Sequence, residues 1–387
     1  MRIAYVTETY PPEINGVSLT VERAVQFLRA RGHQVNLIRP LQPGELARDD
    51  ANELRTAGLP LPMYPDLRFG LAFSWTLARR FQRSKPDLVH IATEGPLGRA
   101  AMMAARRRQI PMTTDFRTNF HVYSAYYRLG WLRPVIARYL REFHNRGRLT
   151  FVPSRTIQNQ LAAEGFRRLE VIGRGVDTTL FSPTRRSRVL RAEWGMSGDD
   201  EHALLYVGRL AREKNVELAL RAFEMVRYLR PRTRMIVVGD GPMRRELEKE
   251  FPAARFVGVR RGKDLADHYA SADLFVFPSE SETFGNVTLE ALASGLGVIA
   301  FNSAAAADLV VHGDNGLVAT PGNESAFIGL VCRSVAMDAD ALAAMRARAR
   351  ESALHTTWDK VLGRFENRLA QTAFADVLEP RRRIAVV

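Results

Sequence analysis

Short apolar runs recur along the first half of the chain at spacings that suit buried strands. The runs are Ile3 to Thr7, Val35 to Ile38, Leu88 to Ala92, Ile110 to Thr114 and Leu149 to Val152. Helix-length segments separate them, among them a stretch from about Ser18 to Ala30 that Gly32 ends. Because strands that alternate with helices pair in parallel through crossover connections, this half predicts an α/β domain.

The same alternation restarts after Val176. The runs of this second half are Leu204 to Gly208, Met235 to Gly239, Phe256 and Val257, Leu274 to Phe277 and Val298 to Phe301. We therefore predict two doubly wound, Rossmann-like α/β domains, residues 1–174 and 175–355, that face each other across a cleft. Residues 356–387 are expected to form a helix that returns to the first domain, followed by a basic tail. Ligands of such sheets bind outside the carboxyl ends of the strands.

Composition narrows the class of protein. A chain of 387 residues with 46% hydrophobic and 25% charged residues is typical of a globular protein with two domains. The single cysteine, Cys332, excludes an intramolecular disulfide framework and suits a reducing compartment. No apolar run reaches the ~18–20 residues of a membrane span, and the first residues lack a signal-peptide pattern. We expect a cytoplasmic protein.

The positive charge is concentrated in the first half. Residues 1–174 hold 27 Lys and Arg against 14 Asp and Glu, an excess of 13 out of the net charge of +14. Nucleic acid and an anionic membrane surface are the two classes of partner that such a charge suits. A basic helix predicted over residues 132–143 could dock on a bilayer at the inner face of the membrane. Packing of its apolar side into the core is the commoner use of such a helix.

A strand, loop, helix and strand between Asp273 and Phe301 carry the most informative chemistry. Glu282 lies in the loop, and Glu290 lies eight positions further on in a helix that begins near Gly285. The backbone N–H groups at Phe284, Gly285 and Asn286 would attract phosphate. This pattern suits a ligand that is part phosphate and part polyhydroxyl, such as a nucleotide sugar. An ordinary turn with solvated glutamates is as compatible with the spacing alone.

Two further loops follow strands and offer groups for phosphate. Arg209 and Lys214, in the segment GRLAREKN, could converge on a diphosphate without a metal, although a solvated loop is the plainer interpretation. Gly16 stands just before the first helix, where a glycine lets the backbone approach a phosphate closely. The segment GDGP lacks the last glycine of the dinucleotide pattern, because Arg244 occupies that position, so a nicotinamide enzyme is disfavoured. No metal-binding spacing of His or Cys is present.

Together these residues resemble those of a retaining glycosyltransferase of family 4, which has the two-domain GT-B fold. The resemblance covers almost the whole chain and rests on the Gly16 loop, GRLAREKN, VVGDGP and the pair of glutamates. The segments RGVDTTLFSP and ETFGNVTLEALASG resemble the branch that acts on glycolipids, including mannosyl- and sulfoquinovosyl-diacylglycerol enzymes. The resemblance implies a hexosyltransferase that needs no metal or other cofactor.

The resemblance also implies a role for each candidate residue. Gly16 would contact the donor phosphates from the first domain. Arg209 and Lys214 would hold the diphosphate, Glu282 the donor sugar and Glu290 the ribose hydroxyls. The backbone at Phe284, Gly285 and Asn286 would stabilise phosphate and sugar, and Val259 would lie near the base. The leaving phosphate would take the acceptor's proton on the same face of the sugar on which the bond to the phosphate breaks, and this retains the anomeric configuration.

The chain departs from the family pattern at Arg117. Relatives usually read His-Thr-x-Phe where this sequence has Arg117-Thr118-Asn119-Phe120. A permanently charged guanidinium cannot shuttle protons at neutral pH, so we expect Arg117 to bind an anion or a sugar. Asp115 and His121 are the residues nearby that could compensate.

We therefore expect transfer of a hexose from a nucleotide-diphospho-sugar, GDP-mannose first and UDP-glucose second, to a lipid-linked or saccharide acceptor. A basic nucleic-acid-binding protein is the rival class, although no helix-turn-helix, zinc-finger or RNP signature supports it. An inactive scaffold of the same fold is a third hypothesis, which only the departure at Arg117 suggests.

Overall fold

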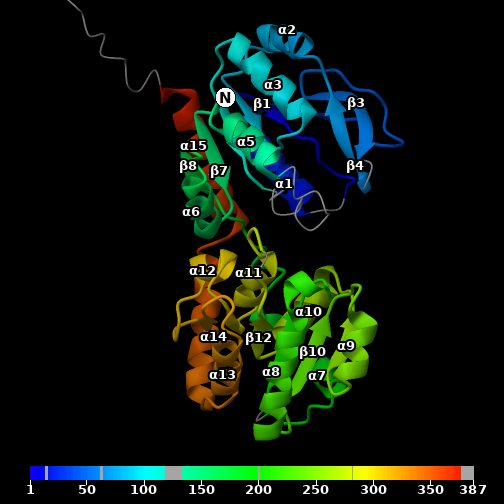
Figure 1. The fold of residues 1–387 in the computed structure, drawn as a ribbon, viewed down its shortest axis with the longest axis vertical. Helices are drawn as coiled ribbons and strands as arrows, with labels where there is room; N and C mark the ends of the chain where they lie inside the picture. The colour runs from blue at the N-terminus through cyan, green and yellow to red at the C-terminus, as the bar shows by residue number, and fades with distance from the viewer. Residues whose placement is uncertain (14–15, 62–63, 118–132, 199–200, 281, 376–387) are drawn as a thin grey trace, which may run out of the picture. The chain divides into compact units, whose positions relative to one another are not determined.

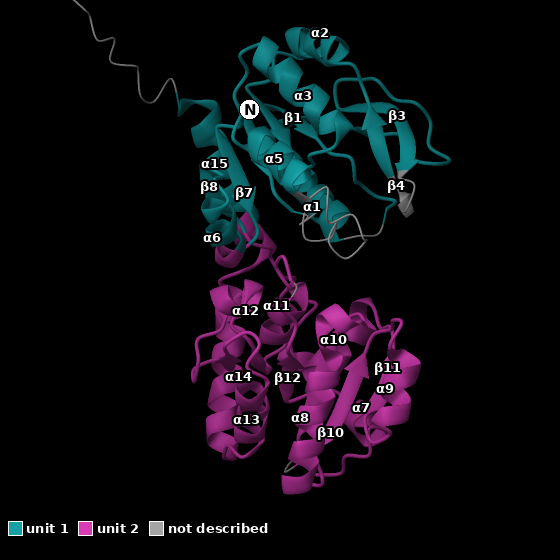
Figure 2. Ribbon diagram, in the orientation of Figure 1, with its two compact units in different colours: residues 1–153, 157–172, 362–387 teal, residues 154–156, 173–361 magenta. Residues whose placement is uncertain are grey.

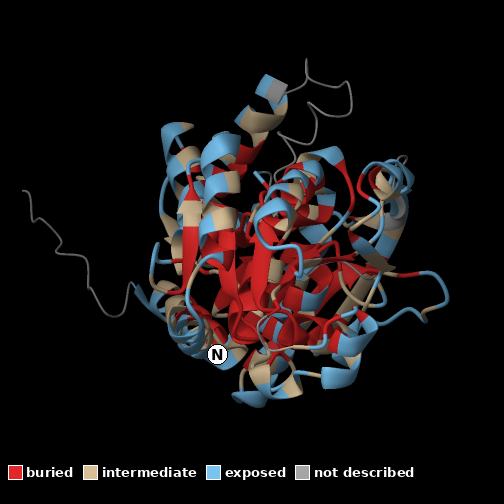
Figure 3. Cartoon of the chain, turned by 90° about the horizontal axis from the view of Figure 1, so that it is seen from below, coloured by how far each residue is buried: buried red, intermediate tan, exposed pale blue. Residues whose placement is uncertain are grey.

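The structure is a computed structural model that describes residues 1–13, 16–61, 64–117, 133–198, 201–280 and 282–375 (Figure 1). The chain divides into two compact units, which Figure 2 colours separately. Unit 1 takes residues 1–153 and 157–172 and the chain from residue 362 onward, and unit 2 takes residues 154–156 and 173–361. Each unit contains its own sheet. The strands of both sheets are mostly buried, and the exposed surface lies on the outer sides of the helices (Figure 3).

Unit 1 is built on a sheet of eight strands in the order β4-β3-β2-β1-β5-β6-β7-β8, within the described residues. The strands are β1 (Arg2–Val6), β2 (Gln34–Pro40), β3 (Glu53–Leu61), β4 (Tyr64–Leu71), β5 (Leu88–Ile91), β6 (Met112–Asp115), β7 (Leu149–Val152) and β8 (Leu169–Val171). Every neighbouring pair is parallel except β3 and β4, which form an antiparallel hairpin. The carboxyl ends of β1, β5 and β6 therefore lie at one edge of the sheet.

Helices cover both faces of this sheet. They are α1 (Gly16–Ala30), α2 (Ser74–Ser84), α3 (Pro96–Arg107), α5 (Arg133–His144), α6 (Arg155–Ala163) and the C-terminal α15 (Trp358–Ala373). The buried sides of α2, α3 and α5 share one apolar cluster with β1 and β5, which includes Leu77, Phe81, Ala101 and Phe143. Glu366 of α15 accepts a hydrogen bond from Arg31 and contacts His33, beside the end of α1.

Unit 2 is built on a sheet of six parallel strands in the order β11-β10-β9-β12-β13-β14, within the described residues. The strands are β9 (Ala203–Val207), β10 (Arg234–Val238), β11 (Arg255–Gly258), β12 (Leu274–Phe277), β13 (Gly297–Phe301) and β14 (Gly316–Ala319). The apolar side chains of β9, β10, β12 and β13 are almost fully buried, as a parallel sheet covered on both faces requires.

The helices of unit 2 flank this sheet. They are α7 (Arg188–Glu193), α8 (Val216–Leu229), α9 (Arg244–Glu250), α10 (Gly262–Ser271), α11 (Asn286–Ala293), α12 (Ala304–Leu309), α13 (Glu324–Val335) and α14 (Ala339–Leu354), with short 3-10 turns η2 (Pro183–Arg185) and η3 (Arg212–Lys214). α8 packs against α13, and α11 packs against α14. The two pairs cover opposite faces, because right-handed crossovers from β9 and β12 lead in opposite directions across the sheet.

The structure corrects the expectation on strand pairing, and for the basic helix it agrees with packing of the apolar side into the core. The alternation of apolar runs predicted only parallel pairing, but β4 pairs with β3 antiparallel, because only two residues separate the two strands and a crossover helix needs many more. The apolar side of the predicted membrane helix faces inward: Leu140 and Phe143 of α5 are buried in the core of unit 1. Packing inside the unit removes these side chains from contact with a bilayer. Residues 118–132, which include His121, lie outside the described residues.

Candidate functional site

The sheet of unit 2 changes its direction of growth between β9 and β12. From β9 the sheet extends through β10 and β11, and from β12 it extends the other way through β13 and β14. Ligands of doubly wound sheets bind at such a switch point, outside the carboxyl ends of the strands. The loop after β9 carries Arg209 and Lys214, and the loop after β12 carries Glu282. Because the strands are parallel, both loops emerge at the same edge.

Lys214 and Glu282 form an ion pair at this edge. The Lys214 Nζ donates to Glu282 Oε1 at 2.6 Å, and Ser279 Oγ donates to the same oxygen at 3.2 Å. Lys214 and Glu282 were predicted from the sequence, whereas Ser279 was not, although a hydroxyl shortly after a buried strand is a usable signal. An ammonium group has three donors, so Lys214 can bind Glu282 and a ligand anion together.

Glu290 lies in α11 and is paired with a tyrosine from another helix. The hydroxyl of Tyr269, in α10, donates to Glu290 Oε2 at 3.1 Å. Burial raises the pKa of Glu290 to about 7, although the hydrogen bond from Tyr269 acts in the opposite direction. The Glu290 carboxyl therefore holds its proton to a higher pH than an exposed glutamate does. Further hydroxyl donors from a ligand would favour its ionised form.

The start of α11 lacks a side-chain cap. Gly285 occupies the N-cap position with φ +94°, in the left-handed region that favours glycine. The N–H groups at an uncapped helix start carry partial positive charge and attract anions. Phe284 is buried, and its carbonyl accepts from Ala305 N at 2.7 Å, which fastens the loop to α12. The side chain of Asn286 accepts from Arg174 Nη1 at 3.4 Å.

Two predicted residues of unit 2 lie apart from the ion pair. The Arg209 side chain is 63% exposed and pairs with Glu213 at 3.7 Å, one turn away in the same loop. Val259 follows β11 and is 56% exposed. Each stands at the carboxyl edge, but their roles toward a diphosphate and a base stay predictions.

The glycines of the GDGP segment serve loop packing. A Cβ atom at Gly239 would lie 1.9 Å from the carbonyl oxygen of Gly208, and one at Gly241 would lie 2.3 Å from the carbonyl oxygen of Leu210. Leu210 N also donates to the carbonyl of Asp240 at 2.9 Å. The two loops that follow β9 and β10 are therefore in backbone contact, and this contact supports the loop that carries Arg209 and Lys214.

Unit 1 places Gly16 at the first residue of α1, as a helix-start position requires. The loop before it is tied through side chains to the segment that follows β2. Glu13 accepts from Thr9 Oγ1 at 2.5 Å and from Gln42 Nε2 at 2.8 Å, and the Gln42 backbone N–H donates to Glu45 at 3.0 Å. These bonds hold the chain that leads toward Gly16.

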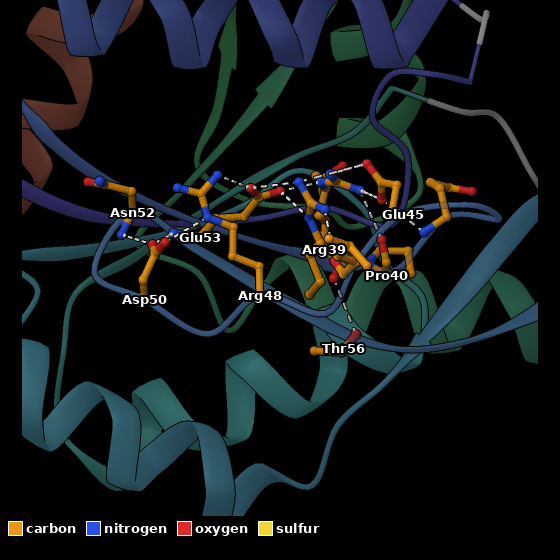
Figure 4. A network of polar contacts seen from close by, with 12 residues as sticks. Arg39, Pro40, Glu45, Arg48, Asp50, Asn52, Glu53 and Thr56 are labelled. Atoms are coloured by element: carbon orange, nitrogen blue, oxygen red, sulfur yellow. Dashed lines mark hydrogen bonds and ion pairs between the residues drawn. The ribbon is translucent and has the colours of Figure 1, made fainter.

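Arg39 anchors this arrangement from inside the unit (Figure 4). Its buried guanidinium donates two hydrogen bonds to Glu45, at 2.6 and 2.7 Å, and one to Glu53 at 2.8 Å. Arg48 and Arg55 pair with the same Glu53, so the carboxylate is neutralised from several sides. The pKa values of Glu45 and Glu53 are lowered by these arginines against the effect of burial. We interpret this network as structural.

Arg117 is fixed by a buried carboxylate. Its Nε donates to Asp115 Oδ2 at 2.5 Å, and His90 Nε2 lies 3.4 Å from the same oxygen. Burial alone would raise the pKa of Asp115, but Arg117 and His90 hold it below its ordinary value. Asp115 is thus an ionised partner of Arg117, and its role as a compensating group stays a prediction. The proposed role of Arg117 toward an anion or a sugar stays a prediction.

Glu8 is a buried acid that the sequence analysis did not single out. Its Oε1 accepts the backbone N–H of Leu97 at 2.7 Å, at the start of α3, where the N-cap residue Gly95 has no side chain to do so. A Cβ atom at Gly95 would lie 1.8 Å from Glu8 Oε2, so only glycine fits there. Burial raises the pKa of Glu8 to about 8. The sequence signal was a glutamate directly after a buried strand.

The described residues also bear on metal binding and on membrane crossing. They contain no group of three or more His, Cys, Asp or Glu side chains arranged to hold a metal ion. Over the same residues, no helix combines the length and the apolar character needed to cross a membrane.

Comparison with known proteins places the chain in a family. The family model described as Glycosyltransferase Family 4 matches residues 14–180, and that described as Glycosyl transferases group 1 matches residues 201–336. The chain is 34% identical over 377 residues to a GDP-mannose-dependent alpha-mannosyltransferase of Mycobacterium tuberculosis, covering 95% of this chain and 96% of the relative. It is 30% identical over 331 residues to a sulfoquinovosyl transferase of Arabidopsis thaliana, covering 83% and 64%.

A solved structure shows the same fold over the whole length. The sucrose-phosphate synthase from Thermosynechococcus elongatus superimposes with a TM-score of 0.73 at 19% sequence identity, covering 97% of this chain and 99% of that one. With the two family matches and the two parallel sheets, this result establishes the predicted architecture. The chain belongs to glycosyltransferase family 4 and is a retaining hexosyltransferase with the GT-B fold.

Proposed function

We propose that this enzyme transfers mannose from GDP-mannose, with retention of configuration, to a lipid-linked or saccharide acceptor. The observation that carries the proposal is the Lys214–Glu282 ion pair at the switch point of unit 2, with the half-buried Glu290 eight positions further along. The mannosyltransferase relative at 34% identity over 95% of the chain supports the donor. The sulfoquinovosyl transferase relative supports an acceptor of the glycolipid branch.

Each group at this edge suits one part of the donor. Lys214 neutralises charge that develops on the leaving diphosphate, and the uncapped start of α11 donates N–H groups to the same oxygens. Glu282 contacts the sugar hydroxyls, and Glu290 accepts hydrogen bonds from the ribose hydroxyls. The acceptor hydroxyl then attacks the anomeric carbon, the bond to the diphosphate breaks, and the leaving phosphate oxygen takes the acceptor's proton on the same face.

Thermal stabilisation by nucleotides tests this proposal. A ligand at 100 times its dissociation constant adds about 2.7 kcal/mol to the free energy of unfolding, which raises the melting temperature measurably. We expect GDP and GDP-mannose to raise it, and UDP, UDP-glucose and ADP to leave it unchanged. A shift with the uridine ligands alone would move the donor to UDP-glucose. No shift with any of them would contradict a donor site at this edge.

Two substitutions separate binding from chemistry. Glu290→Ala should weaken binding of the donor, because it removes the acceptor for the ribose, while Glu282→Ala should mainly lower turnover. Unchanged donor affinity in Glu290→Ala would count against the assignment. Slow hydrolysis of the donor without acceptor would exclude an inactive scaffold. Filter binding of duplex and single strands at moderate salt tests the rival nucleic-acid interpretation.

A further inference from the structure

An exposed aromatic pair stands at the start of α2 in unit 1. Phe73 is 71% exposed and Trp75 is 50% exposed, and their rings stack with centroids 6.0 Å apart. The guanidinium of Arg79 lies over the Trp75 ring, 5.1 Å from its centroid. Large aromatic side chains normally lose most of their surface on folding. An exposed pair of this kind marks a contact with something outside the unit.

One aliphatic side chain of α3 extends this surface. Leu71 of β4 and Leu59 of β3 are also exposed, but they lie on the other face of the hairpin, since a Cβ at the adjacent Gly70 would meet Leu97 of α3. On the neighbouring helix α3, Met103 is also exposed. The opposite sides of α2 and α3 are buried in the core of unit 1, so the exposed sides form its outer surface there.

The same two helices carry only positive charge. Residues 74–85 contain four basic residues and residues 96–108 contain four more, and neither stretch contains Asp or Glu. Arg80 pairs with Asp49, and Arg108 donates to Gln82. Arg83 and Arg107 are exposed and form no ion pair within the described part of the chain. The exposed surface is therefore cationic as well as apolar.

We propose that this surface, defined by Phe73, Trp75, Arg79, Arg83, Met103 and Arg107 and called the α2–α3 face, docks on an anionic lipid bilayer. Tryptophan and other aromatic rings settle at the boundary between lipid headgroups and acyl chains, and basic residues around them are attracted to anionic headgroups. Nucleic acid would use the arginines and could stack on the aromatic rings, but it offers no apolar partner for Met103. A bilayer accepts all of these groups.

The position of the face suits an enzyme that works on lipids. β4 and β3 pair beyond the carboxyl end of β2, since Leu71 is the partner of Ala57, next to the Pro40–Thr56 pair. α2 therefore begins near the carboxyl edge of unit 1, the edge at which Gly16 and Arg117 also lie. The face would bring that edge to the membrane surface. The advantage of placing that edge at the membrane rests on the proposed function with a lipid-linked acceptor. The docking of the α2–α3 face on a bilayer does not depend on that function.

Sedimentation with lipid vesicles tests the proposal on the full chain. Vesicles of phosphatidylcholine alone are compared with vesicles that contain phosphatidylglycerol. The variant Phe73→Ser/Trp75→Ser removes the aromatic pair; serine at residue 73 also supplies the side-chain cap that α2 lacks, so folding should be retained. The variant Arg83→Gln/Arg107→Gln removes two charges. The variant Tyr228→Ser/Arg230→Gln/Arg245→Gln is the matched control, because these residues are exposed on unit 2.

We expect the wild-type chain to prefer anionic vesicles by at least tenfold. Each basic residue near an anionic surface contributes about fivefold, so the arginine variant should bind about 25-fold more weakly. The aromatic variant should lose at least about tenfold on apolar area alone. The control should bind as the wild type does. Tryptophan fluorescence should shift to shorter wavelength on binding and do so less in the aromatic variant.

Equal binding of the wild type and both variants, or binding only to nucleic acid, would overturn the proposal. The GDP-induced shift in melting temperature is measured for every variant, because the face lies outside the donor site. If GDP causes no shift in the wild type while the wild type still binds vesicles, the result would count against the proposed function and leave the docking surface standing. If GDP causes the expected shift but neither variant alters vesicle binding, the result would count against the docking surface and leave the proposed function standing.

Discussion

The raised pKa of the half-buried Glu290 carboxyl predicts that donor binding depends on pH around neutrality. In the free protein the pKa of Glu290 is raised to about 7 by burial. If ligand hydroxyls donate to the ionised carboxylate, the proton must leave when the donor binds below pH 7. The apparent dissociation constant is then the intrinsic one multiplied by 1 + 10^(pKa − pH). This factor is about 11 at pH 6 and about 1.1 at pH 8, so affinity should rise about tenfold between them.

Isothermal titration with GDP-mannose at pH 6, 7 and 8 measures this dependence. The sugar nucleotide is preferred to GDP because a terminal phosphate with a second pKa of about 6 titrates in the same range. Measurement in buffers of different ionisation enthalpy should show release of close to one proton at pH 6 and almost none at pH 8.

Two variants identify the titrating group. Glu290→Gln should bind about 10 to 150 times more weakly at pH 8, the loss of a hydrogen bond to a charged group of ~1.5–3 kcal/mol, and should lose the pH dependence. Tyr269→Phe removes the donor that lowers the pKa of Glu290, so the midpoint should move above pH 7. A flat wild-type profile from pH 6 to 8, or an unchanged slope in Glu290→Gln, would refute the reasoning.

Three further predictions concern the parts that support the site. The pKa of Glu8 is raised to about 8 from an ordinary value of 4.5, so the folded state holds a proton that the unfolded state releases between these values. The free energy of unfolding should then fall by about 1.4 kcal/mol per pH unit as pH rises from 5 to 8, and Glu8→Gln should remove this slope in urea titrations; parallel curves for the two proteins would contradict it. Gly239→Ala should lower the melting temperature more than Gly322→Ala, because both glycines have positive φ but only a Cβ at Gly239 meets a carbonyl oxygen; equal losses would argue against the loop contact. Asp115→Asn should cost about 3–5 kcal/mol in urea unfolding, because it leaves Arg117 without its buried partner, and a loss below 1 kcal/mol would show that solvent replaces the carboxylate.

Most strands were predictable because each is marked by a run of consecutive apolar residues. The runs at Leu88, Leu149, Leu204, Met235 and Leu274 are continuous and apolar, and each forms a strand in the structure. The strands that were missed are β3, β4, β8 and β14. The first two contain Pro, Gly and polar residues, and the last two have three and four residues. They lie at or near the ends of their sheets, where a strand packs against fewer neighbouring elements and needs fewer apolar side chains.

The sequence by itself determined the kinds of residue that the site contains and the strands that carry them. Two of these residues, Lys214 and Glu282, lie in loops that follow buried strands, and Glu290 lies in the helix after the second loop. Because the strands are parallel, these positions come to the same edge of the sheet. Only the tertiary structure decided which side chains meet. Tyr269 reaches Glu290 from a helix 21 positions earlier, and Glu8 reaches the start of α3 across 89 positions. It also decided which apolar residues of the two basic helices are covered: Leu140 and Phe143 of α5 and Leu77 and Phe81 of α2 are buried, whereas Phe73 and Trp75 at the start of α2 are exposed. Apolar periodicity marks a side that avoids water, but only packing shows what covers it.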